Sequence, residues 1–240
     1  MRLNFDCNDN QYDFDLGFGD HGLDGAQAIA DSPYLGNLRS LDLGGNALGR
    51  QGARLILEST CFPKLESLSI ARDNYCRSDT VMRIAAAPFA PSLKSLAVDG
   101  SFASVEAIRS LVEAESLQGV VDLNLAHVSH DDDDAFWPAD MPEPTRKELW
   151  ADGLADVLAS PRMQRMRRLD LSFLHLGNER LASIFSEASF PVLNELSLDS
   201  TGVAREALLA IAQNASLENV TQLNLAGNKV QLDTLFESGS

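Results

Sequence analysis

The sequence has little cysteine and no long apolar run, and each shortage excludes a class of protein. Three cysteines in 240 residues, an odd number without CxxC spacing, give no support to a disulfide framework or a thiolate zinc site. No run of about eighteen apolar residues occurs, as a membrane span would need. The first residues also lack the apolar region of a signal peptide. We therefore expect a cytoplasmic protein without a membrane segment.

Basic residues are also scarce. Thirty-five Asp and Glu against nineteen Lys and Arg leave a formal charge of -16. Nucleic acids and anionic membrane surfaces are polyanions, so this charge argues against both as partners. A composition of 45% hydrophobic and 22% charged residues is typical of a globular protein with a sizeable core. The charge therefore favours a partner that is a basic or mixed-charge protein.

One apolar pattern recurs along almost the whole chain. Two apolar residues flank a single small or polar residue, and successive copies are 27, 27, 28, 27, 46, 27 and 27 residues apart. This alternation, with a period of two, predicts a short strand with one face buried. The pairs are Phe14/Leu16, Leu41/Leu43, Leu68/Ile70, Leu96/Val98, Leu123/Leu125, Leu169/Leu171, Leu196/Leu198 and Leu223/Leu225.

A second apolar pair, spaced i, i+3 as one helix face requires, follows each of the first seven predicted strands, and it begins 12 or 13 residues after the strand with one exception. Each copy is therefore a strand, a loop and a helix of about three turns. Parallel strands need such a crossover, and a unit this small can bury its apolar face only against copies of itself. The pattern predicts a solenoid.

The pattern Leu38-x-x-Leu41-x-Leu43-x-x-Asn46 resembles leucine-rich repeats of the ribonuclease-inhibitor type. The resemblance implies an α/β leucine-rich-repeat horseshoe solenoid, with parallel strands on the concave face and helices on the convex face. We expect one domain over residues 1–240, with an N-terminal cap at 1–10 and eight repeats over 11–237. In that family the ninth motif position forms a hydrogen-bonded ladder. Asn46, Asp73, Ser101, Thr201 and Asn228 could supply it here, whereas Val128 and Leu174 could not.

The exceptional spacing locates an insertion at residues 129–147, in the fifth repeat. It holds four aspartates, Asp131 to Asp134, followed by Phe136 and Trp137. Two interpretations stay open. The insertion is either a solvated loop whose aromatic residues pack over the adjoining repeats, or a partner-facing loop with an aromatic anchor. Thr145 and Glu148 form a capping box that predicts the start of the resumed helix.

The sequence gives weaker support to an enzymatic function. His127, His130 and the four aspartates could collect a divalent cation for metal-dependent hydrolysis, but their spacing is not diagnostic. No GxSxG, HExxH or phosphate-loop motif occurs, so we expect neither catalysis nor a cofactor. The repeats also resemble those of the Ran GTPase-activating protein, which implies regulation of a GTPase as an alternative function.

The predicted concave face is acidic. Its outward positions carry eight acids and one base. The resemblance implies that this face and the loops after the strands grip folded proteins; a competing interpretation is that the acids only provide solubility. The predicted contact residues on the face are Asp42, Asp99, Asp122, Asp170, Glu195, Asp199 and Arg168. Those at the rim and in the insertion are Phe18, Arg72, His127, Phe173, Phe136 and Trp137.

Overall fold

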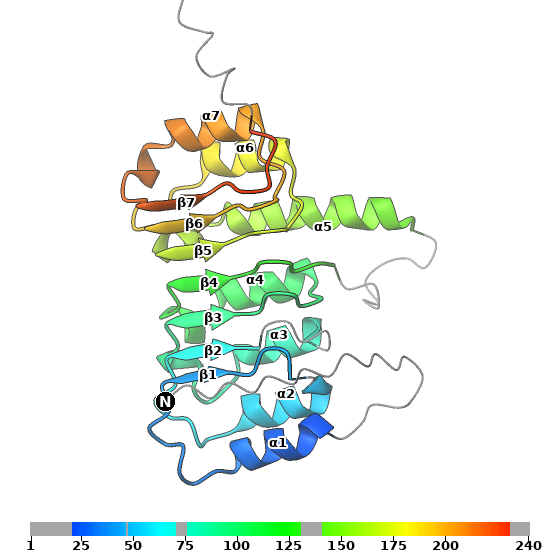
Figure 1. Ribbon diagram of the computed structural model, residues 1–240, viewed down its shortest axis with the longest axis vertical. Helices are drawn as coiled ribbons and strands as arrows, with labels where there is room; N and C mark the ends of the chain where they lie inside the picture. Colours follow the sequence, from blue (N-terminus) through cyan, green and yellow to red (C-terminus); the bar gives the residue numbers. More distant parts are fainter. Residues whose placement is uncertain (1–20, 47, 71–75, 131–140, 231–240) are drawn as a thin grey trace, which may run out of the picture. The chain divides into compact units, whose positions relative to one another are not determined.

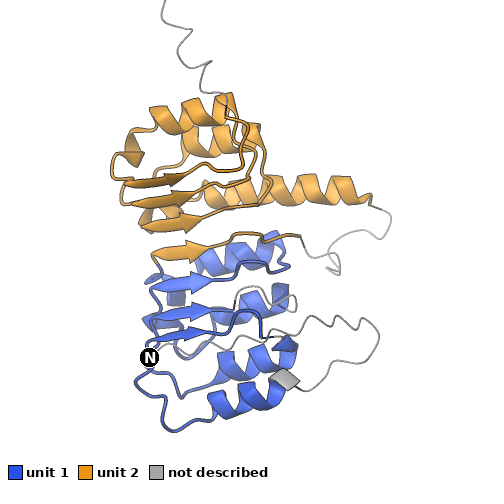
Figure 2. Cartoon of the chain, in the orientation of Figure 1, with its two compact units in different colours: residues 1–120 blue, residues 121–240 orange. Residues whose placement is uncertain are grey.

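The structure is a computed structural model that describes residues 21–46, 48–70, 76–130 and 141–230. These residues belong to two compact units, 1–120 and 121–240, which Figure 2 shows in different colours. The predicted cap at 1–10 lies outside the described residues, as does the first strand pair. Of the predicted contact residues, Phe18, Arg72, Phe136 and Trp137 also lie outside them. The single domain and the count of eight repeats stay predictions.

Unit 1 alternates short parallel strands with helices (Figure 1). Its strands pair in the order β1-β2-β3, and the register places Leu41 beside Leu68 and Leu68 beside Leu96. These leucines are at most 1% exposed. The elements are α1 (His21–Ala30), β1 (Ser40–Asp42), α2 (Gly49–Glu58), β2 (Ser67–Ser69), α3 (Ser78–Ile84), the 3-10 turn η1 (Ala90–Ser92), β3 (Ser95–Ala97), α4 (Val105–Glu113) and η2 (Glu115–Leu117).

Unit 2 repeats the same plan. Its strands pair in parallel in the order β4-β5-β6-β7, with Leu123, Leu169, Leu196 and Leu223 as successive neighbours. The register therefore stays intact across the 46-residue spacing. The elements are β4 (Asp122–Asn124), α5 (Glu143–Leu158), η3 (Pro161–Arg165), β5 (Arg168–Asp170), α6 (Asn178–Glu187), β6 (Glu195–Ser197), α7 (Arg205–Gln213), η4 (Ala215–Leu217) and β7 (Gln222–Asn224).

The chain has the α/β fold of a leucine-rich-repeat solenoid, as its sequence pattern predicts. In both units the helices lie on one side of the strands (Figure 1). The two apolar residues of each strand motif are buried, except in β7, where Leu223 is 44% exposed. Residues of the apolar i, i+3 pairs on the helices are buried as well. Ile56 and Val81 in unit 1, and Leu154 and Leu181 in unit 2, are at most 1% exposed. Helices cover one face of each sheet, and none of the helices or strands that the structure describes covers the opposite face, which we call the open face. Within the described residues, no helix is long and apolar enough to cross a membrane.

The ladder at the ninth motif position is only partly formed. The Asn228 side chain accepts from the backbone N–H groups of Gly202 and Val203, both at 2.9 Å, and so joins two repeats. The Thr201 hydroxyl donates to the Leu198 carbonyl within its own repeat. The Ser101 hydroxyl is buried without a hydrogen-bond partner among the described residues, so its predicted ladder role is wrong. Val128 and Leu174 fill the position with buried apolar groups.

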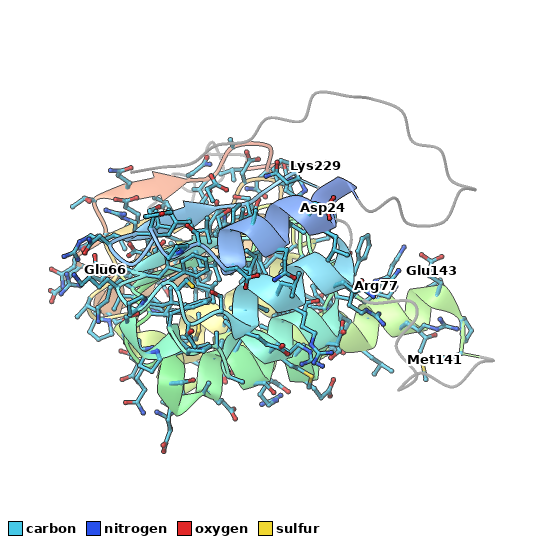
Figure 3. The ribbon with its side chains drawn as sticks, turned by 90° about the horizontal axis from the view of Figure 1, so that it is seen from below. Asp24, Glu66, Arg77, Met141, Glu143 and Lys229 are labelled. Carbon is cyan, nitrogen blue, oxygen red and sulfur yellow. The ribbon has the colours of Figure 1, made fainter. Side chains whose placement is uncertain are left out.

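Helix α5 begins earlier than the sequence indicates. The predicted capping box placed its start at Thr145, whereas the helix begins at Glu143 after Pro142, with no side-chain cap. A proline near the start is compatible with this position because its missing N–H would have no partner there. Figure 3 shows Glu143 and Met141 at the far end of this long helix. Part of the insertion therefore extends a helix, and residues 131–140 lie outside the described residues.

Candidate protein-binding surface

The open sheet face of unit 2 carries three rows of outward side chains, one row for each outward motif position. The first row lies where the strands start, and the third lies just after their C-terminal ends. We call these the start row, the middle row and the end row. The start row is Asp122, Arg168, Glu195 and Gln222; the middle row is Asn124, Asp170, Ser197 and Asn224; the end row is Ala126, Ser172, Asp199 and Ala226.

In the start row, one arginine joins two acids on neighbouring strands. Arg168 on β5 lies 3.3 Å from the Asp122 carboxylate on β4 and 3.0 Å from the Glu195 carboxylate on β6. Burial raises the pKa of the Asp122 carboxyl, an effect that the charge of Arg168 opposes. These acids are therefore partly neutralised, and the face has mixed charge at this end.

Replacement of Arg168 tests how the neighbouring charges set the pKa of Asp122. In Arg168→Gln we expect the pKa of Asp122 to rise further, because burial and Glu195 would then act with less opposition. Arg167→Gln should raise it less, since Arg167 is the weaker of the two neighbouring positive charges. A carbon-13 NMR titration of the Asp122 carboxyl would measure both shifts. An unchanged pKa in Arg168→Gln would contradict the ion pair.

Side chains at the middle motif position accept hydrogen bonds from the nearby backbone. The carboxylates of Asp42 in unit 1 and Asp170 in unit 2 each accept from the N–H two residues later, at 3.1 and 3.0 Å. The amide oxygens of Asn124 and Asn224 make the same bond. Such bonds stabilise a turn directly after the strand. Asp42 and Asp170, both predicted contact residues, therefore already have a structural role in ending the strand.

The end position is the most covered of the three. Asp99 in unit 1 is 8% exposed and Ser172 in unit 2 is 6% exposed. Asp99 is therefore a poor contact group, and its predicted exposure is wrong. Asp199 in unit 2 is partly exposed, and its carboxylate accepts from the Ser200 hydroxyl at 2.8 Å.

The residue that follows the end position lies at the strand-exit edge and takes a left-handed backbone. In unit 1 glycines fill this position at 45 and 100, with φ of 75° and 71°. In unit 2 three of four copies are not glycine: His127, Phe173 and Ser200 have φ of 56°, 62° and 53°, and Gly227 has 66°. The backbone N–H groups of His127, Phe173 and Ser200 each donate to a carbonyl of the next repeat, at 2.8 to 2.9 Å. The neighbouring repeat therefore holds this conformation.

Two of these residues form a stacked aromatic pair. The rings of His127 and Phe173 lie 4.0 Å apart between centroids, with an interplanar angle of 11°. His127 is exposed and Phe173 is partly exposed. A left-handed backbone is unusual for a bulky side chain, and such conformations cluster at functional sites. The sequence pattern indicates both residues as contact residues but not their stacking, although the glycines at the same motif position were a signal of the backbone geometry.

No protein-family model and no curated protein matches the sequence. It is similar to several solved structures, of which three follow. The tropomodulin C-terminal domain of Caenorhabditis elegans is 12% identical, with 68% of this chain and 90% of that chain covered and a TM-score of 0.43. A chain in the structure of the Rad7 and Elc1 complex in yeast is 13% identical. The match covers 85% of this chain and 60% of that chain, with a TM-score of 0.44. An internalin, InlF, from Listeria monocytogenes is 15% identical, with 85% and 45% covered and a TM-score of 0.43.

The metal hypothesis gains no geometric support. Within the described residues, no group of three or more His, Cys, Asp or Glu is placed to hold a metal ion. His127 stacks on Phe173, and His130 is only 8% exposed. Asp131 to Asp134 lie outside the described residues, so the metal-dependent hydrolase stays an untested alternative.

Proposed function

We propose that this chain is a non-enzymatic, cytoplasmic protein-binding module with repeats of the ribonuclease-inhibitor type. A basic or mixed-charge segment of a partner protein binds across the open sheet face and the strand-exit edge of unit 2. The stacked pair of His127 and Phe173 carries the proposal. Such a pair, with one ring exposed and the other partly exposed on a hydrogen-bonded backbone, is the kind of anchor on which protein interfaces depend.

The backbone under the pair supports this role. A left-handed conformation costs roughly 1–2 kcal/mol for a residue other than glycine. Aromatic stacking returns about 0.5–1.5 kcal/mol. The pair contains two left-handed residues, His127 and Phe173, so the backbone costs roughly 2–4 kcal/mol in total, more than the single stacking contact returns. The pair therefore lowers the stability of the fold while it presents two ring systems in a fixed orientation. A surface ordered before binding loses little conformational entropy when the partner arrives.

The charges beside the pair favour a cationic group. Asp199 lies one repeat beyond Phe173, and its carbonyl accepts from the Phe173 N–H at 2.8 Å. A guanidinium of the partner could therefore stack on an aromatic ring and pair with this carboxylate. The acids of the start row share Arg168, which suits a partner with both signs of charge. Association should slow as salt rises.

The test uses a fluorescein-labelled peptide of alternating arginine and glycine, with its affinity measured by anisotropy. We expect the double variant His127→Ala/Phe173→Ala to bind it at least about tenfold more weakly, or about 1.4 kcal/mol. Tyr34→Ala is the matched control because Tyr34 is an aromatic residue 90% exposed elsewhere on the chain. Equal losses in both variants, or no loss in the double variant, would contradict the proposal.

Regulation of a GTPase stays a second prediction, on which the described geometry has no bearing. A turnover assay with candidate GTPases would test it.

A further inference from the structure

The strand-start edge of unit 2 reverses the charge of the rest of the chain. Four arginines occur within seven residues, and no acid lies between Asp156 and Asp170. The arginines are Arg162, Arg165, Arg167 and Arg168. In a chain of net charge -16 this segment is a distinct basic surface.

The local fold directs these arginines outward. Met163 and Met166 are completely buried and hold the segment against the core. The 3-10 turn η3 has three residues per turn, so Arg162 and Arg165 lie on the same side of it. Nη1 of Arg165 donates to the Arg162 carbonyl at 2.6 Å. Burial, followed by the charge of Arg162, lowers the pKa of Arg165, as expected for two cations held close together.

The arginines of this surface differ in whether an acid of the face pairs with them. Arg168 is shared between Asp122 and Glu195. Arg162 and Arg167 are exposed, and neither forms an ion pair with a residue that the structure describes. One repeat later Val192 takes the position equivalent to Arg165 and is 42% exposed. An apolar group therefore borders the cations.

We propose that Arg162, Arg165, Arg167 and Val192, here called the basic edge, bind a carboxylate-rich segment of a protein partner. Guanidinium groups suit this ligand because their planar forks pair with carboxylates in a bidentate manner. Two features favour a protein segment over nucleic acid. The net charge of -16 repels a long polyanion, and Val192 offers contact to an apolar side chain. The basic edge is separate from the aromatic pair and has the opposite charge preference.

The experiment measures binding of the intact chain to a fluorescein-labelled peptide of five Glu-Leu-Gly repeats at low salt. Arg162→Gln/Arg167→Gln should raise the Kd at least about tenfold and leave Arg165 with its bond to the Arg162 carbonyl. The matched control is Lys147→Gln/Arg205→Gln, which removes two positive charges elsewhere in unit 2. It should change the Kd less than about twofold, because distant exposed charges are screened.

Two comparison probes complete the design. A peptide of five Lys-Leu-Gly repeats should not compete, and a fifteen-nucleotide single-stranded DNA should bind more weakly than the acidic peptide. Equal weakening in both double variants would overturn the proposal, as would tighter binding of the DNA. The arginine–glycine peptide should bind Arg162→Gln/Arg167→Gln as it binds the unaltered chain, so this proposal and that of the aromatic pair can fail independently.

Discussion

Leu196→Ala should lower the free energy of unfolding by about 2–5 kcal/mol, whereas Leu223→Ala should lower it by about 1 kcal/mol or less. The two leucines take the same motif position and are direct neighbours in the β6–β7 register. Leu196 is 2% exposed because strands and helices enclose it, and Leu223 is 44% exposed because β7 is the last strand of the described part. Truncation of Leu196 leaves a cavity, and truncation of Leu223 does not.

Urea denaturation followed by tryptophan fluorescence would measure both effects. The two tryptophans, Trp137 and Trp150, belong to unit 2, and Trp150 is 5% exposed in helix α5. The signal therefore reports on the unit that holds both leucines. Leu169→Ala is a further check, since Leu169 is as buried as Leu196 and should cost a similar amount. Equal losses for Leu196→Ala and Leu223→Ala would contradict the difference in burial.

This pair of leucines also marks the limit of inference from the sequence. Periodicity predicts which leucines lie side by side on neighbouring strands. Among the strands that the structure describes, the register within each unit confirms these pairs, including Leu123 with Leu169 across the insertion. The periodicity cannot predict how deeply each of these leucines is buried, because burial depends on whether a further repeat covers the strand. The same limit applies to the start of α5. The capping box predicted a start at Thr145, whereas the helix begins at Glu143 with a proline in its first turn.

For the candidate site, the sequence predicts which strand residues share a face but not how they interact. Alternation along the strands correctly indicates that Asp122, Arg168 and Glu195 share one face, but their mutual pairing requires the register of three strands. Asp170 accepts from a nearby backbone N–H, a local bond that a count of acids does not reveal. Stacking of His127 on Phe173 combines strand register with backbone angles. Two of these three missed features, the Arg168 ion pairs and the stacked rings, are relations between repeats, whereas the sequence pattern describes one repeat at a time.

Gly177→Ala should lower the free energy of unfolding by about 1–3 kcal/mol through the backbone alone. Gly177 precedes helix α6 with φ 81° and ψ 163°, a region that is almost exclusive to glycine. No heavy atom lies within 4 Å of the position that a Cβ would take, so the expected loss does not come from a clash. The Gly177 N–H donates to the Thr201 carbonyl of the next repeat at 3.1 Å, which opposes relaxation to another conformation.

Gly25→Ala is the control for this prediction and should have the opposite sign. Gly25 lies inside helix α1 with no heavy atom within 4 Å of its Cβ position and no left-handed angle. Alanine there should stabilise unit 1 by about 0.5–1 kcal/mol, because glycine loses more conformational freedom in a helix. Urea denaturation followed by circular dichroism would report on both units. A neutral effect of Gly177→Ala would mean that the loop after Phe173 can adopt other backbone angles, and the preordered aromatic pair would then lose its main support.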